Sequence, residues 1–386
     1  MKILYGVVGE GMGHAVRSRV VLEHLAGRGH TLKVVVSGRA HAFLSKHFDD
    51  VVEISGLPLL YEDNAVDRDG TALKILSSSP AYALDNMDAY MREVRSFEAD
   101  AVVSDFESFA YFYAKAHGKP LLSIDNQHAI PLLQHPDEVL EMKNAAGEVV
   151  RDYHADFDLA RRIIRTKMNG ARHYLITTFF FPPIKLKYRK ETSLFPPILR
   201  PEILAAKARA TRGEHVLVYQ TSASNLAMLD VLASLDTHFH VYGFLRADAQ
   251  LPPQIADKAV PEGDDLRYSP NVLLRRFSEQ GFIDDLASAR AVITGGGFTL
   301  MGESVYLGKP VYSIPIAKHF EQIVSARYLE LLGYGEHHEQ VSRQELDAFL
   351  QRVDDYSLAL ARHTQDGNRA LLAKLDQLLA ELATQR

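Results

Sequence analysis

Two residues far apart in the sequence, His14 and Asp105, have the types and positions needed for proton transfer. His14 follows Gly9-Glu10-Gly11-Met12-Gly13, where an apolar run gives way to a helical pattern. The positive end of a helix dipole favours the neutral imidazole, which can accept a proton. Asp105 ends another apolar run, and a carboxylate on the second ring nitrogen would fix the tautomer and stabilise the developing charge. A purely structural role for each residue is the alternative.

A second candidate site is the triple-glycine turn Gly295-Gly296-Gly297. It follows the β-branched run 291–294 and precedes a helical segment that carries Glu303. A glycine turn from strand into helix presents unpaired backbone N–H groups and the positive end of the helix dipole, and these bind anions such as a diphosphate. An ordinary tight turn of an α/β domain is the alternative.

The elements that must position these residues are strands alternating with helices. Alternation of this kind predicts parallel sheets with right-handed crossovers, and fully apolar strands agree because such sheets are buried on both faces. The sequence therefore predicts an α/β protein of two tandem Rossmann-like domains. The expected strands are 2–8, 31–36, 51–55, 101–105, 120–125 and 173–180 in the first half, and 215–220, 238–244, 271–277 and 291–294 in the second.

The strand order of a doubly wound sheet decides which loops meet. With the order 3-2-1-4-5, strands 1 and 4 are neighbours, and ligands bind beyond their carboxyl ends. This order places His14 beside Asp105 in the first half. In the second half it places Gln220-Thr221-Ser222 beside residues 295–297. We expect the two domains to face one another, so that both crevices form one interdomain cleft.

A proline-rich, basic stretch separates the two halves. Residues 181–203 hold five prolines and the cations Lys185, Lys187, Arg189 and Lys190. Proline fixes the backbone and removes donors, so we interpret the stretch as a solvated connector, with contact to anionic lipid headgroups as the alternative. The predicted domains are 1–195, a linker at 196–213, and a second Rossmann-like domain at 214–386. Its terminal helices, expected at 343–351 and 356–383, can pack back on the first domain.

Composition narrows the function classes. The chain has 386 residues, a net charge of −6 and no cysteine. The acidic balance argues against broad nucleic-acid binding, and the lack of cysteine excludes disulfides, thiolate nucleophiles and cysteine-ligated zinc. No apolar run is long enough to predict a transmembrane helix, and the N-terminus resembles a first strand rather than a signal peptide. We expect a cytoplasmic protein, with association at the cytoplasmic face of a membrane left open.

The C-terminal stretch resembles the donor-site signature of inverting nucleotide-sugar glycosyltransferases of the GT-B fold. It is similar both to the UDP-glycosyltransferase superfamily and to the bacterial N-acetylglucosaminyltransferase of peptidoglycan synthesis. Gly11-Met12-Gly13-His14 resembles the family's N-terminal glycine loop, whose histidine is the acceptor base in many members, and Asp105 falls where they carry the aspartate that orients it. The chain departs from the eukaryotic signature at Gly295 and Leu300. The matching residues are Thr294-Gly295-Gly296-Gly297, Glu303, Gly308-Lys309-Pro310, Pro315 and Glu321-Gln322.

The resemblance implies that the domain at 1–195 binds the acceptor and that the domain at 214–386 binds the nucleotide sugar. It also implies a role for each matching position. Gly296 and Gly297 amides, with Thr299 at the helix start, would hold the diphosphate. Glu303 would bind the ribose hydroxyls, and Glu321 and Gln322 those of the donor sugar. A loop at Phe282-Ile283 would contact the base through backbone groups, and Thr221-Ser222 would approach the phosphates.

The expected function is that of a metal-independent inverting glycosyltransferase, a hexosyltransferase that uses a UDP-sugar or a related nucleotide sugar as donor and no cofactor. The acceptor, which the sequence does not specify, would be a small molecule, a lipid-linked molecule or a glycan. One alternative is a nucleotide-sugar epimerase of the same fold, which needs no acceptor. Another is a non-catalytic nucleotide-sugar sensor, which would bind without turnover.

Four further patterns carry less weight. The Asp-x-Asp pairs at 67–69 and 156–158 lie in an acidic loop and in a helical stretch expected at 136–169, so we interpret them as coincidental rather than metal-binding. His337-His338 has no partner at ligand spacing and is expected to be solvent-exposed. Asp125-Asn126-Gln127-His128 ends a strand and is a candidate for lining the acceptor pocket. Gly9-x-Gly11-x-x-His14 lacks the third glycine of a dinucleotide fingerprint, which disfavours a nicotinamide enzyme.

Overall fold

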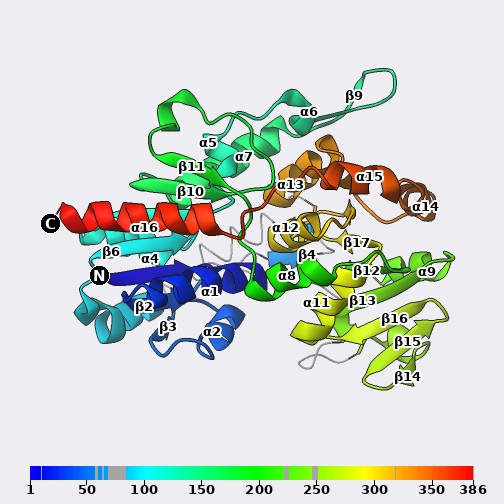
Figure 1. The fold of residues 1–386 in the computed structure, drawn as a ribbon, viewed down its shortest axis with the longest axis horizontal. Coiled ribbons are helices and arrows are strands. Elements are labelled where there is room, and N and C mark those ends of the chain that lie inside the picture. Colours follow the sequence, from blue (N-terminus) through cyan, green and yellow to red (C-terminus); the bar gives the residue numbers. More distant parts are fainter. Residues whose placement is uncertain are drawn as a thin grey trace. The chain divides into compact units, whose positions relative to one another are not determined.

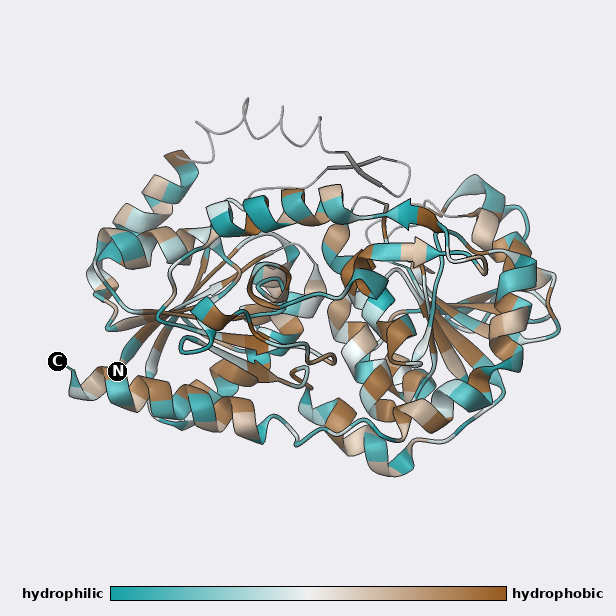
Figure 2. Ribbon diagram, turned by 90° about the horizontal axis from the view of Figure 1, so that it is seen from above, coloured by the Kyte–Doolittle hydropathy of each residue, from teal (hydrophilic) through white to brown (hydrophobic). Residues whose placement is uncertain are grey.

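The computed structural model describes residues 1–9, 11–56, 60–62, 65–67, 84–220, 226–245, 251–317 and 319–385. These form two compact units. The first comprises Met1–Tyr61, Val66–Arg200 and Asp366–Arg386, and the second comprises Glu62–Ala65 and Pro201–Gln365. Each unit is built around one large sheet (Figure 1). In Figure 2 the sheet strands inside each unit are coloured hydrophobic, whereas the surrounding helices show both colours, as expected for sheets covered on both faces.

The sheet of the first unit has the order β11-β10-β7-β6-β1-β2-β3, and its described pairs are parallel. In the part that sequence analysis predicted, this is the order 3-2-1-4-5, so the predicted neighbourhood of strands 1 and 4 is confirmed. β11 was not predicted as a strand. The strands are β1 (Lys2–Val7), β2 (Thr31–Val36), β3 (Val51–Glu53), β6 (Ala101–Asp105), β7 (Leu121–Asp125), β10 (His173–Thr177) and β11 (Thr192–Phe195).

The helices of the first unit follow the predicted alternation with one exception. The stretch 136–169, predicted as one helix, holds a short helix, an antiparallel hairpin and a second helix, because Gly147 adopts φ 81° in a turn that no continuous helix could contain. The elements are α1 (Met12–Gly27), α2 (Arg39–Leu44), η1 (Tyr90–Val94), η2 (Arg95–Phe97), α4 (Ser108–Ala116), α5 (Ala129–Leu132), α6 (Asp137–Leu140), β8 (Glu141–Lys143), β9 (Val149–Asp152), α7 (His154–Lys167) and η3 (Leu186–Tyr188). A two-stranded ladder joins β4 (Leu60–Glu62) and β5 (Ala65–Asp67).

The last helix, α16 (Arg369–Thr384), belongs to the first unit although it ends the chain. Its leucines join the core formed by α1 and the sheet, and both figures show the two chain ends side by side. α1 therefore has buried residues over most of its circumference. Asn368 fixes the entry to α16: its side-chain amide exchanges two hydrogen bonds with the backbone of Leu199, at 2.9 and 2.7 Å.

The sheet of the second unit has the order β14-β15-β16-β13-β12-β17-β18-β19. Its four predicted strands follow the order 3-2-1-4, here as β16-β13-β12-β17, and β18, which was not predicted as a strand, takes the fifth place beside β17. Sequence analysis missed the antiparallel β14–β15 hairpin and the edge strand β19. The strands are β12 (His215–Tyr219), β13 (His238–Leu245), β14 (Val260–Glu262), β15 (Asp265–Ser269), β16 (Val272–Arg276), β17 (Ala291–Thr294), β18 (Val311–Ser313) and β19 (Gly335–His337).

Two expectations for the second half were wrong. His337 is buried on β19, and His338 stacks on the Tyr312 ring and lies 2.8 Å from Glu336, so the pair is not solvent-exposed. The single helix predicted at 356–383 is interrupted, because Gly367 and Asn368 both have positive φ. The helices are α8 (Pro201–Ala206), η4 (Lys207–Arg209), α9 (Ala227–Ala233), α10 (Pro253–Ala256), α11 (Glu279–Ser288), α12 (Phe298–Leu307), α13 (Phe320–Leu331), α14 (Arg343–Gln351) and α15 (Val353–Leu360).

Among the described residues, no helix combines the length and the apolar character that crossing a membrane requires.

Candidate active site

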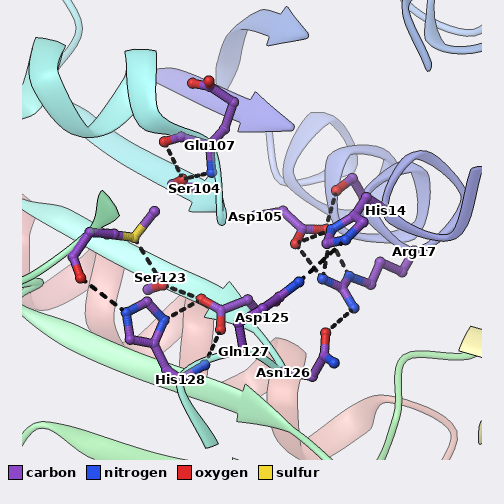
Figure 3. Close-up of polar contacts among 12 residues, drawn as sticks. His14, Arg17, Ser104, Asp105, Glu107, Ser123, Asp125, Asn126, Gln127 and His128 are labelled. Carbon is purple, nitrogen blue, oxygen red and sulfur yellow. Dashed lines mark hydrogen bonds and ion pairs between the residues drawn. The ribbon is translucent and has the colours of Figure 1, made fainter. Parts of the chain in front are cut away.

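The ends of β1 and β6 bring His14 and Asp105 together. The two strands are parallel neighbours, and Val7 at the end of β1 is paired with Asp105 at the end of β6. After β1, Gly11 takes φ 109° and α1 begins at the next residue, so His14 lies in the first helical turn. Its Nδ1 atom is 2.9 Å from Asp105 Oδ1 (Figure 3). The predicted pairing of these two side chains is therefore present in the structure.

Arg17, one turn after His14 on α1, also binds this aspartate. Its Nε donates to Asp105 Oδ2 at 2.8 Å, and its Nη2 donates to Oδ1 at 2.5 Å. Ser18 adds a hydrogen bond to Oδ2 at 3.0 Å. Burial by itself would raise the pKa of Asp105, but the charges of Arg17 and His14 outweigh burial and hold that pKa well below its usual value of 3.8. Asp105 is therefore a buried carboxylate that stays charged.

The contacts of His14 assign its tautomer. Nδ1 is 2.9 Å from the Asp105 carboxylate and 2.8 Å from Arg17 Nη2. Arg17 Nη2 also donates to Asp105 Oδ1, and because a carboxylate only accepts hydrogen bonds, we assign the Nδ1 hydrogen of His14 to Asp105 as well. This assignment leaves the Nε2 lone pair as the basic position. On that side, the Nε2 of Gln127 lies 3.4 Å from His14 Nε2.

The turn after β6 aims Asp105 at α1. Phe106 has φ 55°, in the left-handed region that bulky residues rarely adopt. Two neighbours hold this turn: the Ser104 hydroxyl accepts from the Glu107 backbone N–H at 2.8 Å, and Glu107 caps α4 by accepting from Ala110 N. The Phe106 ring itself packs against His128, with ring centroids 5.8 Å apart. A strained backbone beside a buried carboxylate is a common feature of functional sites.

A second polar network, formed around Asp125 and His128, supports the loop after β7. Asp125 accepts hydrogen bonds from the backbone N–H and the Nδ1 of His128, at 2.8 and 2.7 Å, and from Ser123 Oγ at 2.5 Å. These contacts close a tight turn over residues 125–128. The turn directs Asn126 to Arg17 Nη1, at 2.7 Å, and Gln127 to His14 (Figure 3). Of the four residues proposed to line an acceptor pocket, the middle two reach the His14 site, whereas Asp125 and His128 are buried in their own network.

Gln127 combines burial with an unsatisfied polar atom. The residue is 6% exposed, and its Oε1 atom is buried with no hydrogen-bond partner in the described structure. An unpaired buried polar atom costs about 1–3 kcal/mol. The amide of this side chain faces the basic nitrogen of His14. The unpaired Oε1 atom therefore lies close to the position where proton transfer would occur.

In the second unit, the glycine turn lies between β17 and α12. Gly296 has φ 84°, and a Cβ atom there would lie 3.1 Å from Gln322 Cβ, so the turn packs closely against the start of α13. The Gln322 Oε1 atom accepts from the backbone N–H of Ile316 at 2.9 Å. Gly297 is exposed and forms the N-cap of α12, so the free N–H groups of this helix begin at the turn, as sequence analysis predicted.

Lys309 lies just after α12, at the end of the segment that the glycine turn begins. Its buried ammonium donates to the carbonyl oxygens of Thr211 and Ala289. Burial, together with the nearby charge of Lys207, lowers the pKa of Lys309 to about 8. These contacts give Lys309 a structural role, because they join the end of α12 to earlier segments of the chain.

One group in the described part of the chain has the composition of a metal site. Possible ligand atoms of His215, His240 and Asp285 lie within 4.8 Å of one another. However, Asp285 Oδ2 already accepts from Tyr242 OH at 2.6 Å and lies 3.5 Å from Arg275 Nε, whose charge repels a cation. His215 Nε2 is 2.9 Å from the Asp285 carbonyl oxygen. These internal contacts favour a structural polar cluster over a metal centre.

Comparison with known proteins identifies the family. A family model described as glycosyl transferase family 1 matches residues 1–354. The chain belongs to this family. An uncharacterized glycosyltransferase of Methanosarcina acetivorans is 24% identical over 369 residues, which cover 90% of this chain and 86% of the relative.

Solved glycosyltransferases share the fold along the whole chain. An anthocyanidin 3-O-glucosyltransferase in complex with UDP matches with a TM-score of 0.63 at 13% identity and covers 100% of this chain and 99% of its own. MurG of Acinetobacter baumannii matches with a TM-score of 0.57 at 12% identity, covering 98% and 100%. The resemblance and the GT-B fold that sequence analysis suggested are therefore confirmed, and the protein is a glycosyltransferase.

The remaining residues to which the family resemblance gave a role occupy varied positions. Glu303 is buried on α12, and Thr299 is half-buried in the first turn of that helix. Glu321 and Gln322 lie, partly exposed, in the first turn of α13. Thr221 and Ser222 lie outside the described residues. The binding roles of all these residues stay predictions.

One placement within this set was wrong. Phe282 and Ile283 do not form a loop, because both belong to α11 and the backbone N–H of Phe282 donates to Ser278 O. That hydrogen bond already uses the N–H group of Phe282, and both side chains are buried.

Sequence analysis missed Arg17 and Ser18, which complete the aspartate's hydrogen bonds in this glycosyltransferase. The available signal was their spacing: residues three and four positions after His14 lie on its face of a helix. A basic residue there, opposite a buried carboxylate, could have been predicted as its partner once the strand order was assumed.

Proposed function

We propose that this glycosyltransferase transfers a sugar from a UDP-sugar, or a closely related nucleotide sugar, to an acceptor hydroxyl with inversion at the anomeric carbon. The observation that carries the proposal is the His14–Asp105 pair, with Nδ1 held at 2.9 Å from the carboxylate and Nε2 left as the basic nitrogen. A histidine arranged in this way can remove the proton of a hydroxyl nucleophile.

In the proposed reaction, the acceptor oxygen attacks the anomeric carbon as its proton passes to His14 Nε2. The bond from the anomeric carbon to the diphosphate oxygen breaks, and the nucleoside diphosphate leaves with the bonding electrons. A single displacement from the opposite face inverts the configuration. Asp105 stabilises the imidazolium as it forms, and Arg17 keeps Asp105 charged and in place.

The donor part of the proposal concerns the glycine turn. The free N–H groups at the start of α12 and the positive end of its dipole would stabilise the negative charge on the leaving diphosphate, so that neither a metal ion nor a further cofactor is needed. Glu303 would bind the ribose, and Glu321 and Gln322 the donor sugar. The glucosyltransferase that shares this fold was solved with UDP, which supports a uridine nucleotide as the first donor to test.

The test separates the two parts of the site. A thermal-shift panel of nucleotide sugars identifies the donor, because a bound ligand stabilises the folded state by mass action. His14→Ala should abolish transfer and leave UDP affinity unchanged in calorimetry, whereas Glu303→Ala should weaken UDP binding. Retained turnover by His14→Ala would reject the base. Conversion of the donor with no acceptor present would instead indicate an epimerase.

A further inference from the structure

An extended stretch of the first unit is strongly cationic although the chain as a whole carries a net charge of −6. Residues 159–190 contain no aspartate or glutamate. The same stretch contains nine cations, namely Arg161, Arg162, Arg165, Lys167, Arg172, Lys185, Lys187, Arg189 and Lys190. A charge distribution this uneven favours contact with an anionic partner, the alternative that the sequence left open, over a solvated connector.

The fold brings the two ends of this stretch together. Arg165 on α7 donates to Tyr188 OH on η3 at 3.2 Å, and Lys185 Nζ lies 5.7 Å from the centre of the Phe157 ring on α7. Lys185 shows how concentrated the charge is: burial lowers its pKa, and Arg161, Arg165 and Lys187 lower it further. We call α7 residues 159–166 and the segment 181–190 together the basic face.

Several cations of the basic face lack a carboxylate partner, although Arg189 Nε donates to the Ile184 carbonyl oxygen and Lys187 Nζ lies 4.7 Å from the centre of the Tyr188 ring. Among the described residues, none of Arg162, Lys187, Arg189 and Lys190 forms a salt bridge with a carboxylate. Arg162, Lys187, Arg189 and Lys190 are all exposed. Their charges are therefore available to an external anionic surface.

Large apolar side chains are exposed among these cations. Leu186 is 74% exposed, Ile163 55% and Phe181 53%. Leu159, Arg162, Ile163 and Thr166 have the spacing of one exposed helical stripe, opposite the buried Ile164. Burying a side chain of this size contributes about 1.5–3 kcal/mol, which the folded chain leaves unused here.

We propose that the basic face docks on the surface of an anionic lipid bilayer. The headgroup region of such a bilayer offers negative charge to the cations and an apolar boundary to the interleaved leucine, isoleucine and phenylalanine. A nucleic acid would use the cations but would give the aliphatic side chains no partner. This inference does not depend on the identity of the donor.

The basic face also lies close in the fold to the proposed acceptor side. α7 packs against α5, and α5 begins two residues after Gln127, which faces His14 (Figure 1). If the proposed function holds, docking would present this glycosyltransferase to acceptors that are held at a membrane. Only this consequence rests on the proposed function.

The test is co-sedimentation of the full-length protein with vesicles. Binding is expected to vesicles of phosphatidylcholine with phosphatidylglycerol, to weaken as salt is added, and to be absent with phosphatidylcholine alone. The triple variant Lys187→Gln/Arg189→Gln/Lys190→Gln should lose about fivefold in affinity per charge, on the order of a hundredfold in all. Leu186→Ser should weaken binding that remains at high salt.

Matched controls come from exposed positions elsewhere. Lys46→Gln/Arg343→Gln/Arg362→Gln removes three exposed charges outside the basic face, and Leu358→Ser changes a leucine that is 70% exposed on α15. Both controls should bind as the wild type does. Equal losses in the two triple variants, or no binding to anionic vesicles, would overturn the proposal. Binding to heparin or single-stranded DNA without vesicle binding would overturn it in favour of a polyanion site. Because vesicle binding is measured without donor or acceptor, failure of the proposed sugar transfer leaves this result unaffected.

Discussion

At the scale of single residues, the site depends on the buried carboxylate of Asp105, which both Arg17 and His14 contact. Asp105 is 1% exposed and Arg17 4%, and neither group would be stable there without the other. His14 uses the same carboxylate, so its orientation follows from the Arg17–Asp105 pair. The sequence indicated His14 and Asp105 because strand ends in a doubly wound sheet are restricted. It did not indicate Arg17, because a helical pattern does not show which polar residues on a mostly buried helix face inward.

Asp105→Asn should change how stability depends on pH. The folded-state pKa of Asp105 is lowered below 3.8, so the carboxylate contributes stability that is fully present above that value and is lost as the pH falls below it. The substitution should cost about 3 kcal/mol or more near pH 7, because it leaves the Arg17 charge unpaired. Urea unfolding at several pH values should show the cost shrinking between about pH 5 and pH 2. A cost that stays constant with pH would contradict this account.

Gln127→Ala should affect the acceptor rather than the donor. The Gln127 Nε2 atom is 3.4 Å from His14 Nε2, and its buried Oε1 has no hydrogen-bond partner in the described structure, which an acceptor hydroxyl would supply. Loss of one such hydrogen bond should lower kcat/KM for the acceptor by up to about tenfold, with the free energy of unfolding nearly unchanged because an unpaired polar atom is removed.

The control for Gln127 is Gln134→Ala, a nearby residue whose side chain is exposed. Steady-state kinetics and UDP calorimetry should show no change for this variant. If Gln127→Ala lowered UDP affinity as much as kcat/KM, its role would concern the donor or the fold, and the positioning role would be rejected.

At the scale of elements, the sequence predicted the secondary structure best where a buried strand is followed by a helix. The alternation of apolar strands with helices is a strong signal because both faces of a parallel sheet are covered. The hairpin β8–β9 was missed because its strands are short and mostly exposed, so no apolar alternation marks them. The Phe282-Ile283 segment was placed in a loop because its expected role, rather than its pattern, decided the assignment.

The glycine turn gives the sharpest prediction at this scale. Gly296→Ala should cost about 1–2 kcal/mol, because φ 84° is unfavourable for alanine and the new Cβ atom would crowd Gln322. Gly297→Ala is the control: Gly297 has φ −60°, and a Cβ atom there meets nothing within 4 Å. Its cost in urea unfolding should stay below about 1 kcal/mol.

The same pair of variants tests the donor site through a second measurement. If a diphosphate packs against the exposed Gly297, the Gly297→Ala variant should bind UDP more weakly while its stability is retained. Equal stabilities for the two alanine variants would show that the backbone conformation of Gly296 is not what this turn requires.

At the scale of the whole molecule, the last helix of the chain, α16, packs into the core of the first unit. The N-terminal strand β1 and the C-terminal helix α16 share one core. His24 Nε2 on α1 lies 2.8 Å from Asp376 Oδ1, and Arg28, the residue after α1, forms a salt bridge with the same aspartate. Sequence analysis left the position of the terminal helices open, since an amphipathic leucine pattern shows that a helix is buried but not which sheet buries it. Contacts this distant in sequence depend on the tertiary fold, so local patterns could not predict them.

Leu375→Ala should therefore destabilise the unit that begins at residue 1. Leu375 is fully buried on α16, in one core with Leu22 and Leu25 of α1, and truncation of such a leucine costs about 2–5 kcal/mol. The control is Leu358→Ala on α15, where the side chain is 70% exposed and the cost should stay within about 0.5 kcal/mol. Urea unfolding, followed by circular dichroism, measures both variants. If Leu375→Ala were as stable as Leu358→Ala, α16 would not hold the core of the first unit, and the packing of the chain's two ends would need another explanation.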